Sequence, residues 1–144
     1  MKILLTLLGA LTASVCFSQS HTIPKEKWHW DNPSKQDTLA GYAQVLRVDN
    51  ILYISGAVTT KLTPEGIREV YQALEKSLQS NGATFQNVVK ENVYTTDIET
   101  LKTYNSVRKA FYKRDFPAAT WVEVSRLYMK DAKLEVELIA HLLK

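Results

Sequence analysis

The side chains best suited to catalysis lie near the C-terminus, in the stretch from Phe116 to His141. Three glutamates occur there, Glu123, Glu135 and Glu137, within two runs of residues that alternate with a period of two. A carboxylate on a strand can orient a water molecule or carry its proton. A glutamate on the outward face of a strand is more often solvated or paired across strands. The residues by themselves leave both roles open.

Thiol and metal chemistry have weaker support. The only cysteine, Cys16, lies in an N-terminal segment that we expect to be removed, which leaves no thiol nucleophile and no thiolate ligand. His21 and His29 could bind a metal, but no carboxylate partners accompany them in the sequence. We therefore expect no metal and no cofactor.

Residues 1–20 have the features of a secretory signal peptide. A short basic start is followed by an apolar run, residues 3–15, that is too short for a stable membrane anchor. Ser18 and Ser20 supply small residues for cleavage after Ser20, and cleavage after Ser18 is an alternative. The sequence thus predicts a periplasmic or secreted protein with no stable membrane insertion after signal removal. The competing interpretation is a cytosolic protein with a fraying N-terminal helix.

The charge of the chain does not favour nucleic acid as a partner. The formal net charge is +3, and removal of the signal takes away Lys2 and no acidic residue, which leaves +2. Proteins that bind nucleic acid or anionic membranes usually carry a clustered excess of basic residues. We therefore expect no nucleic-acid partner.

The rest of the chain indicates one α+β domain behind a leader. Residues 21–40 are polar and contain Pro24 and Pro33, which predicts an extended leader, and residues 41–144 carry the domain. Trp28 and Trp30 alternate in the leader, so both indoles could dock on one surface. The length suffices for a single hydrophobic core.

Alternation and helical spacing predict the element order ββαβαββ. The first two strands should be joined by a two-residue turn at Asp49-Asn50. The first helix should begin after the N-cap Thr63 and end at Asn81-Gly82. The expected strands cover 41–48, 51–58, 88–96, 119–125 and 134–141, and the expected helices cover 64–80 and 98–111.

The last two strands are expected to form an antiparallel hairpin across residues 128–132. Right-handed crossovers should place both helices on one face of a single mixed sheet. The opposite face is either solvated or closed against copies of the chain. It would carry Glu123, Ser125, Glu135, Glu137 and Ile139.

Four local sequences resemble the RidA/YjgF reactive-intermediate deaminase family, over about residues 41–141. They are Gly41-Tyr42, Ile54-Ser55-Gly56, Tyr104-Asn105 with Phe111, and FPA-x-x-x-VEV-x-RL followed by KLEVELIA. The resemblance implies a chorismate-mutase-like α+β fold and a homotrimer whose sheets close a central barrel. It also implies clefts between subunits, where archetypal members bind small molecules and hydrolyse enamines and imines to ammonia and a ketoacid.

The resemblance also implies roles for individual residues. Glu135 would orient the attacking water, Tyr42 would pack on the substrate, and Ser55 and Asn105 would hydrogen-bond at its edges. The chain departs from the signature at Ala119, where the family has an arginine that grips the substrate carboxylate through two hydrogen bonds.

Trp121 stands where the family usually has a smaller residue, and on the same strand face it would make the cleft apolar and tighter. Loss of the guanidinium should cost on the order of 3 kcal/mol in binding an anionic imine.

Three hypotheses remain: a ligand-binding trimer with weakened or lost deaminase activity, an active deaminase with another anchor such as Arg47, and a non-catalytic interaction or holdase-like trimer.

Overall fold

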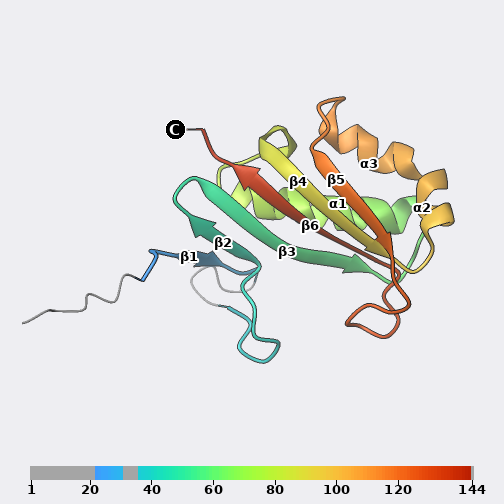
Figure 1. Cartoon of the computed structure of the whole chain (residues 1–144), viewed down its shortest axis with the longest axis horizontal. Helices are drawn as coiled ribbons and strands as arrows, with labels where there is room; N and C mark the ends of the chain where they lie inside the picture. The colour runs from blue at the N-terminus through green and yellow to red at the C-terminus, as the bar shows by residue number, and fades with distance from the viewer. Residues whose placement is uncertain (1–21, 31–35, 144) are drawn as a thin grey trace, which may run out of the picture.

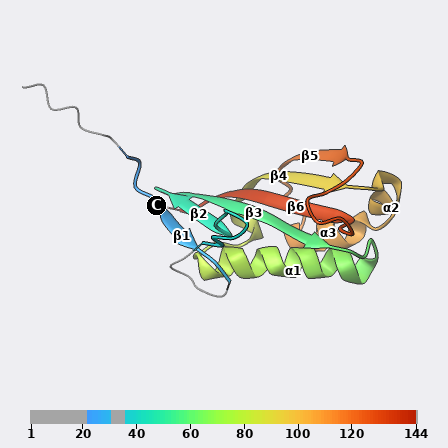
Figure 2. The ribbon, with the colours of Figure 1, turned by 90° about the horizontal axis from the view of Figure 1, so that it is seen from below.

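The structure, a computed structural model, describes residues 22–30 and 36–143, so the expected signal peptide lies outside the described residues. One six-stranded sheet forms a layer in the order β1-β2-β3-β6-β4-β5 (Figure 1). Helices α1 and α3 lie together on one of its faces (Figure 2). The strands are β1 (Glu26–Trp28), β2 (Val45–Val48), β3 (Ile51–Thr59), β4 (Val88–Thr95), β5 (Ala118–Glu123) and β6 (Leu134–His141), and the helices are α1 (Pro64–Ser80), α2 (Ile98–Thr103) and α3 (Asn105–Tyr112), with a 3₁₀ turn at Phe85–Asn87.

The predicted hairpin between the last two strands is wrong, because β4 lies between them. Strand β6 pairs antiparallel with both β3 and β4, whereas β5 pairs with the outer side of β4 in parallel. The apolar face of β6 explains its central position: Leu134, Val136, Leu138 and Ala140 are all buried. Strand β5 is mostly exposed, so it suits the edge of the sheet.

The local signals for α1 and for the first turn are confirmed. Thr63 Oγ1 accepts a hydrogen bond from the Gly66 amide at 3.2 Å and caps the helix. At the other end Gly82 has a φ of +75°, and the Ala83 amide donates to the Leu78 carbonyl at 2.9 Å. Asp49 has a φ of +52° in the turn between β2 and β3.

The second predicted helix is in fact two helices, α2 and α3. Tyr104 divides them with a φ of −99° and a ψ of 13°, and its amide is shared by the Thr100 and Leu101 carbonyls at 3.3 and 3.2 Å. A shared bond of this kind is typical of a helix end. The expected second helix was therefore right in extent and wrong in continuity.

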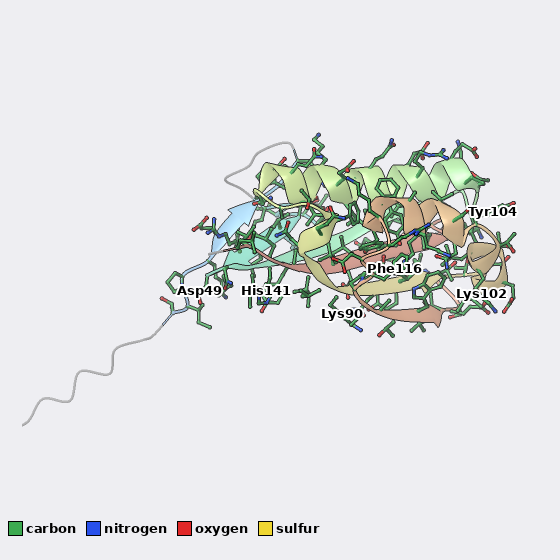
Figure 3. The ribbon with its side chains drawn as sticks, turned by 90° about the horizontal axis from the view of Figure 1, so that it is seen from above. Asp49, Lys90, Lys102, Tyr104, Phe116 and His141 are labelled. Carbon is green, nitrogen blue, oxygen red and sulfur yellow. The ribbon has the colours of Figure 1, made fainter. Side chains whose placement is uncertain are left out.

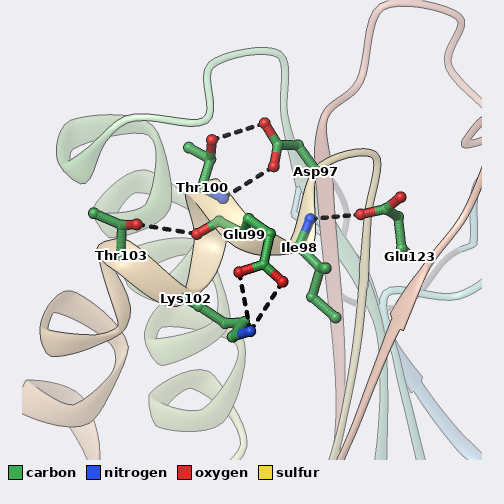
Figure 4. A network of polar contacts seen from close by, with 7 residues as sticks. All are labelled: Asp97, Ile98, Glu99, Thr100, Lys102, Thr103 and Glu123. Atoms are coloured by element: carbon green, nitrogen blue, oxygen red, sulfur yellow. Dashed lines mark hydrogen bonds and ion pairs between the residues drawn. The ribbon is translucent and has the colours of Figure 1, made fainter.

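Helix α2 is held at its start by two carboxylates (Figure 4). Asp97 accepts from the Thr100 amide at 2.9 Å and from its hydroxyl at 2.7 Å. Glu123 Oε2 accepts from the Ile98 amide at 2.9 Å, which ties β5 to the helix. The expectation that Glu123 lies on the helix-free face is therefore wrong.

Strand β5 has the predicted alternation but the opposite orientation. In the parallel pairing with β4, Ala119 lies opposite Glu91 and Trp121 opposite Val93, and Glu91 and Val93 are buried under the helices. Ala119, Trp121 and Glu123 thus face the helices, and Ser125 lies beyond the end of the strand. The orientation of β5 is reversed because β5 pairs with β4 and not, as predicted, with β6. The register with β4 decides which side chains of β5 face the helices.

The leader takes part in the sheet through β1, which was not predicted as a strand. It pairs antiparallel with β2, with Glu26 opposite Arg47 and Trp28 opposite Val45. Trp28 packs against the core, and the Trp30 ring lies edge-on to it at 5.1 Å. Within the described residues no helix has both the length and the apolar character needed to cross a membrane.

Candidate functional site

The six residues proposed for the site fall into two groups on opposite faces of the sheet. Tyr42, Ser55 and Glu135 line one cavity on the helix-free face; we call this group, with Gly56 and Glu137, the carboxylate half-site. Ala119 and Trp121 lie on the edge strand β5 and face the helices, and Asn105 begins helix α3 on the same side of the sheet; we call this group, with Arg108 and Phe116, the tryptophan half-site.

The carboxylate half-site is built around an irregularity in β3. The register of β3 with β6 shifts between Ile54 and Ala57, so Gly56 lies in the bulge. A Cβ on Gly56 would lie 2.1 Å from Glu135 Oε1, so only glycine leaves room for that carboxylate. Strand β3 continues past the bulge to Thr59, close to the expected end of the strand at residue 58.

The cavity of this half-site has a volume of about 480 Å³, which is within the range of small-molecule sites. Burial and then the charge of Glu137 raise the pKa of Glu135. Glu137 Oε1 itself accepts from Asn92 Nδ2 at 2.8 Å and from the Tyr94 hydroxyl at 3.2 Å. A carboxyl with a raised pKa is suited to taking up and returning a proton. The full lining is Asp37, Ala40, Tyr42, Ser55, Gly56, Val58, Tyr128, Met129, Glu135 and Glu137.

The leader and the segment after it support Tyr42 and Ser55. The His29 ring lies edge-on to the Tyr42 ring at 5.7 Å. Ser55 Oγ donates to the Ala43 carbonyl at 2.7 Å, and Gln44 Nε2 donates to the Ser55 carbonyl at 2.9 Å. These contacts fix the side chains that form one wall of the cavity.

The tryptophan half-site contains a buried ion pair that the sequence analysis missed. Glu91 on β4 is fully buried, and Arg108 on α3 is 7% exposed. Arg108 Nε donates to Glu91 Oε2 at 2.7 Å, and its terminal nitrogen is 2.6 Å from the same oxygen. The hydroxyls of Tyr71 and Tyr112 donate to Glu91 Oε1 at 2.8 and 2.9 Å.

Aromatic rings surround the guanidinium of Arg108. Its carbon lies 4.9 Å from the ring centre of Tyr112, 5.4 Å from that of Trp121 and 5.8 Å from that of Phe116. Burial raises the pKa of Tyr112, and the charge of Glu91 raises it further, so the phenol stays protonated and remains a donor. The positive charge of Arg108, which lies over the Trp121 ring, is therefore already compensated by Glu91.

A usable signal for this pair was present in the sequence. Glu91 occupies the same strand face as Val93, and Arg108 follows Leu101 by seven residues on the helical stripe. Opposite charges at two core-facing positions predict a buried pair, because a lone buried charge is too costly.

Some of the proposed site residues are not brought together. Ala119 and Trp121 do not line the cavity that contains Glu135. Arg47, the suggested substitute anchor, is 3.7 Å from Glu26 and donates to the Asp49 carbonyl, away from both half-sites. Among the described residues no group of three or more His, Cys, Asp or Glu side chains could hold a metal ion.

Comparisons with known proteins identify the family of the chain. The family described as Endoribonuclease L-PSP matches residues 33–142. The chain is 34% identical to the human 2-iminobutanoate/2-iminopropanoate deaminase over 108 residues, which are 69% of this chain and 78% of the relative. The bovine deaminase of the same name is 36% identical over the same shares.

A solved structure of the Rid family protein YyfA from Yersinia pestis superposes with a TM-score of 0.71 at 27% identity, over 83% of this chain and 100% of that one. The fold, the matched range and the relatives lead to one conclusion. The chain belongs to the RidA/YjgF family.

Proposed function

We propose that this protein binds a small metabolite in clefts between the subunits of a homotrimer, with imine deaminase activity that is weakened or lost. The observation that carries the proposal is the separation of the two half-sites across the sheet. A single chain cannot bring Trp121 to Glu135, whereas a second chain could set its β5 edge against the first chain's carboxylate half-site. Each cleft would then use residues of two chains.

The chemistry of the carboxylate half-site supports a hydrolytic origin. Glu135, with its raised pKa, can accept a proton from a water that attacks a C=N carbon and return it to the departing nitrogen. The relatives named 2-iminobutanoate/2-iminopropanoate deaminase support the same reaction class.

The tryptophan half-site explains why the activity would be weak. Ala119 offers no guanidinium for a substrate carboxylate. Arg108, the nearby cation, donates to Glu91 through two nitrogens and is covered by aromatic rings. An anionic imine would lose a charge-assisted contact, which costs on the order of 3 kcal/mol.

A coupled assay that generates 2-iminopropanoate in situ and follows ammonia release tests the activity, with the human relative as the reference. We expect much slower turnover by this protein. Ala119→Arg with Trp121→Ala should gain activity beyond the sum of the single changes, because the two residues share one strand face. Glu135→Gln should then remove the gain.

Wild-type turnover equal to that of the human relative would show that the missing arginine does not matter. Sedimentation at micromolar concentration tests the assembly separately. A monomer under those conditions would contradict the inter-subunit cleft.

A further inference from the structure

A second cavity of about 480 Å³ lies on the helix-free face beside the carboxylate half-site. It shares Tyr42, Ser55 and Glu137 with the cavity described above, so the two border one another. Three lysines also line it, and two of them, Lys25 and Lys27, come from the leader. None of the proposed roles uses these lysines.

The floor of this cavity is a row of residues that crosses five strands. Lys27 pairs with Leu46, Leu46 with Tyr53, Tyr53 with Ile139, and Ile139 with Lys90. Three apolar side chains thus lie between two lysines. Lys90 projects from the side of the sheet away from α1 (Figure 3). Lys27 faces the same side, because the next residue of β1 packs into the core.

The lining of the cavity carries excess positive charge. Lys25, Lys27 and Lys90 contribute +3 and Glu137 contributes −1, which leaves +2. Glu137 already accepts hydrogen bonds from Asn92 and Tyr94. No ion pair within the part of the chain that the structure describes uses any of the three lysines.

Neutral hydrogen bonds orient two of these lysines without compensating their charge. Lys27 Nζ donates to Gln36 Oε1, and Lys90 Nζ donates to Thr120 Oγ1 at 2.6 Å. An ammonium with a neutral partner keeps its full charge and two further donors for a ligand. The cavity therefore combines cations with apolar surface, which suits an anion with a hydrocarbon body.

The distance between the leader lysines and Glu135 sets the length of such a ligand. Lys27 lies three strands and four residues away from Glu135, a Cα separation of roughly 19 Å. Side chains stand roughly perpendicular to a sheet, so they close this gap only in part. A molecule that touches both must span on the order of 10 Å or more.

We propose that the leader lysines hold the anionic end of an elongated metabolite, whose hydrocarbon body lies on Leu46, Tyr53 and Ile139. The far end of the metabolite reaches Glu135. The anion is then remote from the group at Glu135, unlike the carboxylate of an α-imino acid, and an arginine at position 119 is unnecessary. This inference rests on the proposed small-molecule site, since it extends that site.

Calorimetric titration of hexanoate, propanoate and hexan-1-ol into protein expressed from the full chain tests the proposal. We expect hexanoate to bind more tightly than propanoate by several-fold for each added methylene that is buried. We expect Lys25→Gln with Lys27→Gln to weaken hexanoate binding at least tenfold and to leave hexan-1-ol binding unchanged. Added salt should weaken hexanoate binding to the wild type.

Lys109→Gln is the matched control, since Lys109 is an exposed lysine of α3 outside the cavity. It should bind hexanoate as the wild type does, and Lys27→Arg should retain most of the affinity. Equal hexanoate binding by the lysine double variant and by the wild type would overturn the proposal, as would equal affinities for propanoate and hexanoate. The titration measures binding, so its result does not depend on the imine assay. If hexanoate binding depends on the leader lysines and the protein sediments as a monomer, the lysine subsite is kept and the proposed cleft between subunits is rejected.

Discussion

Replacement of Arg108 by glutamine should destabilise the protein strongly, because it removes one member of a buried ion pair. Glu91 is fully buried and receives hydrogen bonds from two arginine nitrogens and two tyrosine hydroxyls. In the Arg108→Gln variant the hydroxyls of Tyr71 and Tyr112 remain as donors to this carboxylate, but the positive charge beside it is gone. Breaking a buried pair in this way costs about 3–5 kcal/mol.

That cost is a large share of a typical folding free energy of about 5–15 kcal/mol. For a chain of this size it lowers the melting temperature by on the order of 10 °C. Urea unfolding, with linear extrapolation at a fixed protein concentration, measures the loss directly. The double change Glu91→Gln and Arg108→Gln should cost clearly less than the sum of the two single changes.

The control for this experiment is Lys102→Gln. Lys102 Nζ lies 2.9 Å from Glu99 Oε1, but both side chains are more than half exposed (Figure 4). Exposed pairs of this kind contribute about 0.3–0.5 kcal/mol. If Arg108→Gln costs no more than Lys102→Gln, Glu91 is not held as a desolvated charge and the account of the cluster is wrong.

Three further outcomes are expected. Gly56→Ala should displace the Glu135 carboxylate, and a crystal structure of the variant with Glu135 unmoved would contradict this, since the new Cβ would lie 2.1 Å from Oε1. The raised pKa of Glu135 means that the folded state binds its proton more tightly than the unfolded chain does, so the wild type should lose stability relative to Glu135→Gln as the pH rises through the acid range. Urea midpoints of both proteins at pH 3.5 and pH 7 check this, and an unchanged difference between them would refute it. Export should remove the first 18–20 residues, and an intact mass from the native host that retains Met1 would reject the signal peptide.

Local features of the fold could be predicted from the sequence because few residues determine them. Thr63 and Gly82 bound α1 as expected, since a cap depends on one side chain or one backbone conformation. The buried face of β6 was also predicted, because its alternation is unbroken from Leu134 to Ala140.

Strand order was the part that local patterns could not determine. The link between β5 and β6 looked like a hairpin, but the crossover through α2 and α3 puts β5 on the outer side of β4. That error reversed the expected orientation of Trp121 and Glu123.

The roles of the candidate site residues stay a prediction. Tyr42, Ser55 and Glu135 line one cavity, whereas Ala119 and Trp121 do not line it. The sequence analysis made no prediction for the Glu91–Arg108 pair, because such a pair is visible only when two core-facing positions from distant segments are compared. The leader lysines were missed because β1 was not expected to enter the sheet.

The position of β1 has a practical consequence for anyone who trims this protein to its family match. That match begins at residue 33, after β1 has ended. A chain cut there would leave β2 as an open edge with unpaired amides and carbonyls along Val45–Val48. Open edges of this kind pair with other chains. In the full chain the edge is instead the three-residue strand β1, which carries Glu26 and Lys27, and short charged edges pair less readily. We therefore expect a trimmed protein to aggregate more readily than the full chain, for reasons unrelated to its ligand site.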